Sequence, residues 1–454
     1  MIQPKITINM KKLKLISLAL STALFASGLA VAQDKALLNT LVNKGVITQE
    51  EASQIAKESV VVRPAQNTVR SLTFQGRIQT QYEYIQVNET QSLNNAVPAA
   101  GRQRATNDFI MRRLFLGATA DLGSGWSGVI TADFAATSTG AGGRNYIVDA
   151  YVRKAVDVDY LRGRFDVGYR KVNFGQEENT GSANLLAVER SLATNYFTGN
   201  YNANGAGTQG RRLGFGNRGV GLFWDGTVPQ VEGLGYGLAV TTNQNQTFQL
   251  QNAASNTLAF WANLLYRNQY EGLKYTVGVN YGYKPKGSFT GTTANPVAFR
   301  SAWGVNPYLQ LEYDAALLRA EYLFADVENG QTTNPNSQGA APQGANIFLA
   351  YTFDLGASGK LQPVFRYSYL QTNGRGIAVS DGIRNANNGV TAPYNSAYSL
   401  YGGFNWLILG NAVKLSAGLE YAEFSGFTAA QSALANQKPQ ADVLAVRAQL
   451  QLLF

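Results

Sequence analysis

The chain has 454 residues, a formal net charge of +9, a mean hydropathy of −0.15 and 45% hydrophobic residues. It contains 24 tyrosines, 22 phenylalanines and 47 glycines but no histidine and no cysteine. The missing residue types exclude a Ser–His triad, His-ligated zinc, thiolate chemistry and a disulfide framework. We therefore predict that the protein is not an enzyme and has no metal site and no cofactor. No apolar run after the N-terminus reaches the roughly 18 residues that a membrane helix needs.

Residues 1–32 have the pattern of a cleaved export signal. Lysines that follow Met10 precede an apolar stretch ending near Leu29, and residues 30–32 (AVA) form a small-x-small cleavage site. Met10 is the better candidate for the functional start. Cleavage removes four lysines and no acid, which leaves a net charge of +5. This mild excess suits anionic solutes or lipid phosphates and is too weak to indicate nucleic-acid binding.

Residues 33–69 differ from the rest because their apolar residues follow helical spacing. Gly45 can end one helix, and Thr48 with Glu51 forms a capping box for a second. We predict a short periplasmic helical hairpin and a linker around Pro64, which act as a spacer or assembly handle. A peptidoglycan or trimerisation contact is an alternative that no particular residue supports.

From residue 70 to 454 the apolar period changes to two. In the first segment Leu72, Phe74 and Ile78 share one face, whereas Arg77 and Glu83 share the other. Sixteen segments have this pattern, near residues 72–85, 108–121, 126–136, 146–156, 161–171, 218–226, 234–243, 258–267, 273–283, 303–313, 317–327, 345–354, 361–371, 397–407, 412–424 and 441–454. Long strands with one apolar and one polar face, in an even number, are typical of a water-filled membrane barrel.

The connections between these segments alternate between short and long, Gly/Asn-rich stretches, as periplasmic turns and extracellular loops do. Aromatic residues gather near strand ends, where interfacial girdles lie. The last strand alternates down to Phe454, which resembles the signal that the outer-membrane barrel-assembly machinery recognises. The predicted fold is all-β: a 16-stranded antiparallel transmembrane β-barrel over 70–454, with a short N-terminal helical segment, in the outer membrane of a Gram-negative cell.

Several stretches resemble the phosphate-selective porin O/P family. Residues 168–177 (GYRKVNFGQE), followed by 189–191 (ERS), are similar to that family's G-x-x-K-x-P-F-G-x-E…E-R-S segment, with Asn173 in place of the proline. Further matches are 149–151 (DAY), 402–408 (GGFNWLI) and the closing VRAQLQLLF. The resemblance implies a homotrimeric channel whose third long loop, 172–217, folds inward as a constriction.

Strand parity assigns charged residues to the interior. The candidate anion-binding or pore-lining cations, with those of the loop after the fifth strand, are Arg77, Arg113, Arg153, Arg170, Lys171, Arg190, Arg211, Arg212, Arg319, Arg366, Lys414 and Arg447. A ladder of guanidinium groups can pass an anion between sites, because each is permanently charged and offers forked donors. Inward acids such as Asp166, Glu321 and Glu420 can instead pair with these cations, which is the purely structural alternative. A slip of one residue in any strand inverts its parity.

These features favour a passive diffusion channel with a preference for anions such as phosphate or polyphosphate. Two alternatives stay open: a general or carboxylate/sugar porin in which acids offset the arginines, and a barrel-anchored surface adhesin or receptor. The expected partners are outer-membrane lipid and lipopolysaccharide, the barrel-assembly machinery through Phe454, two further copies in a homotrimer, and small anionic solutes, with no nucleic acid.

Overall fold

The computed structural model describes residues 48, 69–89, 102–135, 146–199, 212–216, 218–242, 257–285, 301–328, 339–386, 394–427 and 440–454. The predicted signal peptide, almost all of the predicted helical hairpin, and Arg211 lie outside these residues. The chain divides into two compact units, Met1–Val69 and Arg70–Phe454. Within the described part of the chain no helix is long and apolar enough to cross a membrane.

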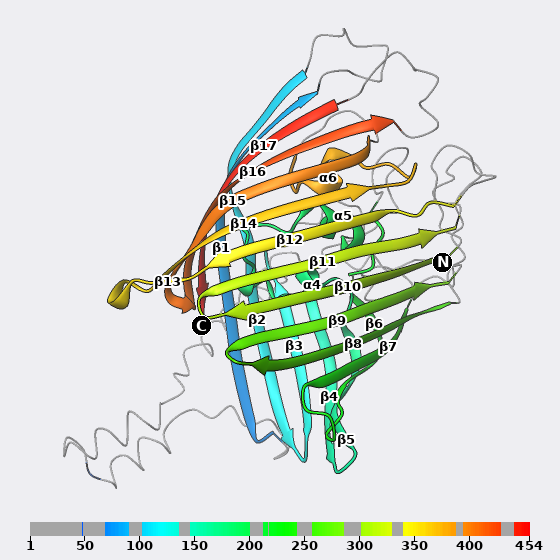
Figure 1. Ribbon diagram of the computed structural model, residues 1–454. Coiled ribbons are helices and arrows are strands. Elements are labelled where there is room, and N and C mark those ends of the chain that lie inside the picture. Colours follow the sequence, from blue (N-terminus) through cyan, green and yellow to red (C-terminus); the bar gives the residue numbers. More distant parts are fainter. Residues whose placement is uncertain are drawn as a thin grey trace, which may run out of the picture. The chain divides into compact units, whose positions relative to one another are not determined.

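The second unit is a closed ring of antiparallel strands (Figure 1). The strands are β1 (Ser71–Glu89), β2 (Arg102–Gly123), β3 (Trp126–Asp133), β4 (Ile147–Val158), β5 (Leu161–Lys171), β6 (Arg218–Thr227), β7 (Leu234–Thr242), β8 (Leu258–Tyr270), β9 (Leu273–Lys284), β10 (Ala302–Tyr313), β11 (Ala316–Val327), β12 (Gln343–Tyr351), β13 (Phe353–Asp354), β14 (Lys360–Gln371), β15 (Tyr394–Asn411), β16 (Val413–Phe427) and β17 (Gln440–Leu453). β12 and β13 both pair with β14 and are two parts of one strand interrupted at Thr352. β1 pairs with β2 and with β17, which closes a barrel of 16 strands and confirms the predicted fold class.

The alternation of each strand separates a polar interior from an apolar exterior. On β17, Arg447, Gln449 and Gln451 are buried inside the barrel, whereas Leu450 and Leu452 are exposed on the outer face. This arrangement is the reverse of a soluble protein. It satisfies a bilayer, which requires apolar side chains outside and every backbone hydrogen bond made within a closed sheet.

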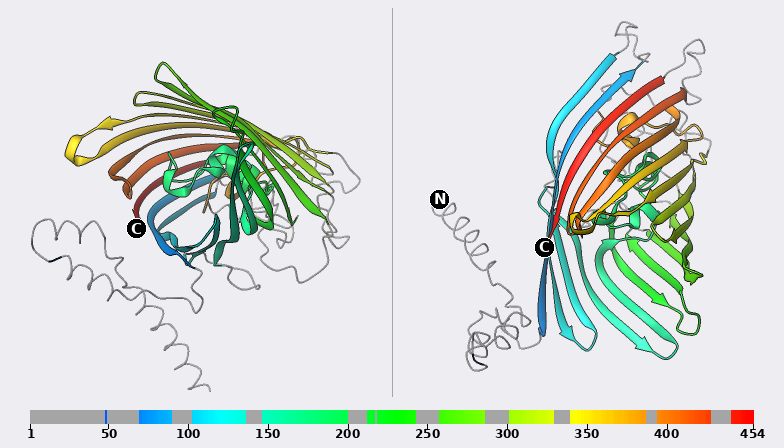
Figure 2. Two further views of the ribbon diagram at one scale, coloured as in Figure 1. Left: turned by 90° about the horizontal axis from the view of Figure 1, so that it is seen from below. Right: turned by 60° about the vertical axis from the view of Figure 1, so that its left-hand side comes forward.

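The described residues of the long connection after β5 lie inside the ring of strands, as Figure 2 (left) shows. We call its described residues, 172–199 and 212–216, the inner loop. It contains α4 (Gln176–Asn179), the 3₁₀ turn η2 (Ser182–Asn184) and α5 (Leu192–Thr198). α5 packs against β11, β12, β14 and β15, and against α6 (Val379–Gly382) from the connection after β14. The inner loop therefore occupies one side of the lumen.

An apolar cluster inside the barrel holds the inner loop in place. Phe174 and Phe215, from its two ends, stack with ring centroids 4.8 Å apart, and Trp261 of β8 meets Phe215 edge-on at 6.2 Å. Leu192 and Phe197 of α5 are also fully buried. Burial of such side chains contributes about 1.5–3 kcal/mol each, so the loop is a packed part of the barrel interior.

β2 contains a bulge that reverses its parity. Gln79 of β1 pairs with Arg113, but Thr80 pairs with Met111, so Arg112 is an extra residue. Phe109 and Met111 are therefore exposed on the outer face, at 74% and 47%. With uniform alternation they would share the inner face of Arg113. The bulge also turns Arg112 inward, beside Arg113.

Candidate permeation site inside the barrel

The first anchor of the inner loop is the buried carboxylate of Glu177. It accepts hydrogen bonds from the backbone N–H of Ser191 (3.0 and 3.1 Å) and from its hydroxyl (2.6 Å). The same hydroxyl caps α5 by accepting from the N–H of Thr194 at 3.2 Å. A buried carboxylate without such donors would be very costly. Glu177 thus joins the start of α4 to the start of α5.

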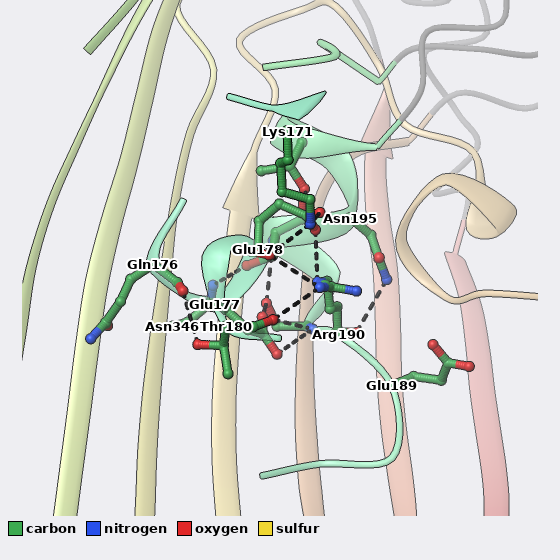
Figure 3. A network of polar contacts seen from close by, with 12 residues as sticks. Lys171, Gln176, Glu177, Glu178, Thr180, Glu189, Arg190, Asn195 and Asn346 are labelled. Carbon is green, nitrogen blue, oxygen red and sulfur yellow. Dashed lines mark hydrogen bonds and ion pairs between the residues drawn. The ribbon is translucent and has the colours of Figure 1, made fainter. Parts of the chain in front are cut away.

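Glu178 is a second anchor, between two cations (Figure 3). The Lys171 ammonium contacts its carboxylate and donates to its carbonyl oxygen at 2.9 Å. The Arg190 Nε lies 2.7 Å from its Oε2. Burial raises the pKa of Glu178, but Arg190 and Lys171 outweigh that effect and lower the pKa to about 2. Two of the predicted anion-binding cations are therefore engaged by a carboxylate of the protein itself.

Glu189 is the third anchor and binds the wall at the bulge. The Arg112 guanidinium donates to both of its carboxylate oxygens, the Nη2 bond being 2.9 Å, and Arg384 lies 3.6 Å away. Burial raises the pKa of Glu189, whereas Arg112 and Arg384 bring it well below its usual range. Arg113 donates to Gln79 at 2.8 Å. Strand parity could not find Arg112, because only the bulge turns it inward.

Two predicted cations, Arg366 of β14 and Arg447 of β17, are buried inside the barrel. Arg366 donates to Glu420 at 2.6 Å and to the carbonyl oxygen of Glu189 at 2.7 Å. Arg447 lies 3.4 Å from Glu420 and 3.8 Å from Glu83. Neither guanidinium is more than 3% exposed. Both guanidinium groups therefore pair with acceptors of the same chain, as the purely structural alternative for the inward cations predicts.

The other predicted cations also contact acceptors of the protein, except Arg211, which lies outside the described residues. Arg77 donates to the Ser182 hydroxyl, Arg153 to Asp166 (2.7 Å), Arg170 to Asp166 and Asp225, Arg212 to the Asp381 carbonyl (3.1 Å), Arg319 to Gln310 (3.0 Å) and Thr180 (3.2 Å), and Lys414 to the carbonyls of Ala183 (2.7 Å) and Leu185 (3.2 Å). Their role in anion binding stays a prediction.

The segment that resembles the family motif begins and orients the inner loop. Gly175, with a φ of +81°, precedes α4 in a conformation that favours glycine. Asn173, which stands where the family has proline, donates to Asp225 at 2.8 Å and to Asn263 at 3.0 Å. Side-chain hydrogen bonds to β6 and β8 therefore hold the loop entry here.

An open cavity lies on the other side of the inner loop, against β5–β10. Its volume is about 1310 Å³, and it extends to the short connection between β6 and β7. The loop contributes four uncharged polar side chains to its lining, Asn173, Gln176, Asn179 and Thr180. We call this the lumen cavity.

Apart from Glu312, which strand parity assigns to the interior, the charged groups that line the lumen cavity are ones that the sequence analysis missed. The charged groups of the lining are the cations Arg162, Arg164, Arg267 and Lys274, and the acids Asp225, Glu232 and Glu312. Arg162 and Arg164 share the parity of the predicted Arg170, so extending the same rule down β5 would have found them. None of the described cations that were predicted lines this cavity.

A closed barrel with an apolar exterior, an inward-folded loop and a polar lumen defines an outer-membrane porin channel. The chain belongs to the phosphate-selective porin O and P family, whose sequence profile matches residues 88–454. This match confirms the resemblance that the sequence suggested. The location follows from the family and the barrel: the outer membrane.

Solved structures with a similar fold have little sequence identity to the chain. OprB of Pseudomonas putida is 12% identical over 83% of this chain and 94% of its own, with a TM-score of 0.50. An anion-selective porin from Comamonas acidovorans is 11% identical over 84% and 99%, with a TM-score of 0.49. The outer membrane channel DcaP of Acinetobacter baumannii is 11% identical over 84% and 97%, with a TM-score of 0.49. A search of curated proteins found no match.

Proposed function

We propose that this porin is a passive diffusion channel for small hydrophilic solutes that prefers anions, phosphate and polyphosphate among them. The observation that carries the proposal is an excess of interior cations without an acid partner. Arg77, Arg113 and Lys414 donate to neutral acceptors only. In the lumen cavity Arg267 and Lys274 make no ion pair with an acid of the described chain.

Such cations raise the potential of the whole lumen. The barrel wall and the bilayer have a low dielectric constant, so the field of buried and half-buried charges is concentrated in the water-filled path. A small anion can therefore be attracted without being held by one strong site, which is what conduction requires. Family membership points to the same class of solute.

A general porin is the second candidate, and the paired arginines favour it. Arg153, Arg170, Arg366 and Arg447 all contact carboxylates. If such pairing extended to the permeation path, selectivity between anions and cations would be small.

Reversal potentials in planar bilayers under a KCl gradient distinguish the two candidates. We expect anion selectivity, and we expect added phosphate to reduce the chloride current. The double variant Arg267→Gln/Lys274→Gln is expected to lower the selectivity. Lys360→Gln is the matched control, because Lys360 is exposed beside Asp354 and does not line the lumen cavity. Absence of step conductance would contradict the channel, and cation selectivity would contradict the anion preference.

The homotrimer, export by residues 1–32 and recognition of Phe454 by the barrel-assembly machinery belong to the same proposal. Family membership supports the trimer. The position of Phe454 at the closing seam supports the third point, because its carbonyl accepts from the N–H of Gly76 of β1 at 2.6 Å. Cross-linking of the purified protein in detergent, followed by mass determination, tests the trimer.

A further inference from the structure

The inner loop presents a neutral hydrogen-bonding face to the lumen cavity. Glu178 and Arg190 of this loop converge with Lys171 of β5, and Gln176 points away from them (Figure 3). Glu177 and Glu189 are occupied by Ser191 and Arg112. The loop adds four uncharged side chains to the lining of the lumen cavity: Asn173, Gln176, Asn179 and Thr180. A loop rich in charge thus offers amides and a hydroxyl to a passing solute.

The opposite wall offers the same chemistry. Asn263 of β8, Asn280 of β9, and Gln310 with Tyr308 of β10 line the lumen cavity. Part of their hydrogen-bonding capacity is unused within the described chain. The Asn263 Oδ1 accepts a hydrogen bond from Asn173, but the Asn263 Nδ2 makes no hydrogen bond within the described chain. The exposed Asn179 amide and the Tyr308 hydroxyl also make none within these residues.

Charge and amides lie in one cavity. Arg267 and Lys274 come from facing ends of β8 and β9, which are joined by a short turn. They lie on the same cavity wall as Asn263 and Asn280 of these strands. A solute in this cavity therefore meets these two cations and several groups that can both donate and accept, besides Arg162, Arg164 and the three acids of the lining.

Chloride uses only the donors of this lining, and inorganic phosphate uses mainly the donors, because at neutral pH it carries only one or two P–OH groups. An alcohol hydroxyl both donates and accepts, so it can use an amide oxygen as well as an amide N–H. A site built to bond hydroxyl groups discriminates against analogues that lack them. We propose that the lumen cavity favours hydroxylated organic anions, such as sugar acids or sugar phosphates, over anions of equal charge without hydroxyl groups. This inference rests on the proposed anion-preferring channel.

Permeability ratios in planar bilayers test the inference with three probes of four carbons each. Threonate carries a carboxylate and hydroxyls, butyrate carries the carboxylate alone, and threitol carries the hydroxyls alone. We expect threonate to permeate better than butyrate, measured against chloride, and to inhibit the chloride current at lower concentration. Threitol is expected to inhibit only weakly, because it lacks the charge that Arg267 and Lys274 attract.

Two variants separate the contributions of charge and hydroxyl recognition. Asn179→Ala removes an exposed amide, so the barrel should fold, and the advantage of threonate should fall by about fivefold for one lost hydrogen bond. Phosphate inhibition should be unchanged. The double variant Arg267→Gln/Lys274→Gln should lower the permeability of threonate and butyrate and weaken the inhibition by phosphate to the same extent. Gln230→Ala is the control, because Gln230 lies on a short connection and does not line the lumen cavity.

The outcomes of this experiment distinguish the inference from the proposed function. Equal permeability of threonate and butyrate in an anion-selective channel would overturn the inference and leave the proposed function intact. An unchanged threonate advantage in Asn179→Ala and in a second variant, Asn263→Ala, would also overturn it. A channel that does not conduct, or that prefers cations, would overturn the proposed function itself.

Discussion

At Glu178 one carboxylate meets two cations that approach from opposite ends of the same loop segment. Lys171 closes β5, and Arg190 precedes α5 by two residues. Because Glu178 is only 14% exposed, water screens these contacts little. The pair of ion contacts is therefore one of the anchors that hold the inner loop, and the charge state of Glu178 can be followed through the conductance of the pore.

Acidification should leave the inner loop in place until Glu178 is protonated. Its pKa in the folded protein is about 2, below the ordinary value of 4.5, so its contribution to stability is complete above about pH 4.5 and is lost as the pH falls toward about 2. We expect single-channel conductance to be constant from pH 7 to about pH 4 and to change only as the pH approaches 2. Glu178→Gln should shift the conductance at pH 7. A transition of the parent protein centred near pH 5 that Glu178→Gln abolishes would contradict this assignment.

Substitution of Arg366 tests whether this residue stabilises the fold or binds permeating anions. Removing a partner from a buried ion pair costs about 3–5 kcal/mol, because the other charge is left without compensation. We therefore expect Arg366→Met to lower the free energy of unfolding by that amount, measured by urea denaturation in vesicles. Arg162→Met is the matched control, because the Arg162–Asp157 pair is 62% and 70% exposed and should contribute less than about 1 kcal/mol. An Arg366→Met barrel of full stability with lowered anion selectivity would instead assign Arg366 to the permeation path.

At the scale of the strand, the bulge in β2 reconciles two incompatible demands. Phe109 and Met111 must face outward with Leu116, yet their even spacing from Arg113 would turn them inward in a regular strand. Inserting Arg112 as an unpaired residue corrects the parity and also supplies the partner of Glu189. Sequence periodicity shows the conflict but cannot locate the extra residue, because the bulge is defined by pairing with β1.

Deletion of Arg112 tests this interpretation of β2. Without the extra residue, Met111 and Arg113 become neighbours that still face outward and inward, so every other pair with β1 is retained. We expect the deletion variant to fold, as judged by its heat-modifiable band in electrophoresis, with altered conductance because Glu189 loses its partner. Deletion of Ala118, which has a regular partner in Phe74, should abolish assembly because it inverts the neighbouring residues. Equal assembly of the two variants would contradict the role of the bulge.

Local alternation explains why the strands could be predicted from the sequence and the lining of the lumen could not. β5 spans Leu161–Lys171, as its alternation predicts. The polarity of each side chain indicates which face of the strand it occupies, so no distant contact is needed for this prediction. Whether an inward cation meets solute depends on where α5 packs. That position depends on contacts such as the bond from the Ala193 N–H to the Ser368 hydroxyl, 175 residues away in the sequence. No local period encodes such a contact, so Arg366 was predicted as lining and Lys274 was missed.

At the scale of the whole barrel, closure joins the two ends of the sheet at β1 and β17. Phe454 lies at this seam, and its N–H and carbonyl both bond to Gly76. A Cβ built on Gly76 would stand 2.3 Å from the Phe454 ring, so the terminal ring occupies the space that glycine leaves. The Phe454 ring and Gly76 of β1 are thus complementary in shape.

Substituting Gly76 should weaken the seam. Gly76→Val must displace the Phe454 ring, and overpacking of this kind costs about 1–3 kcal/mol. We expect a lower temperature for conversion of the folded band to the unfolded band in electrophoresis. Gly128→Val is the control, because a Cβ there meets nothing within 4 Å and valine favours strands. In a Phe454→Ala background the effect of Gly76→Val should disappear, since the two residues are then uncoupled. If Gly76→Val destabilises that background equally, the ring is not the cause.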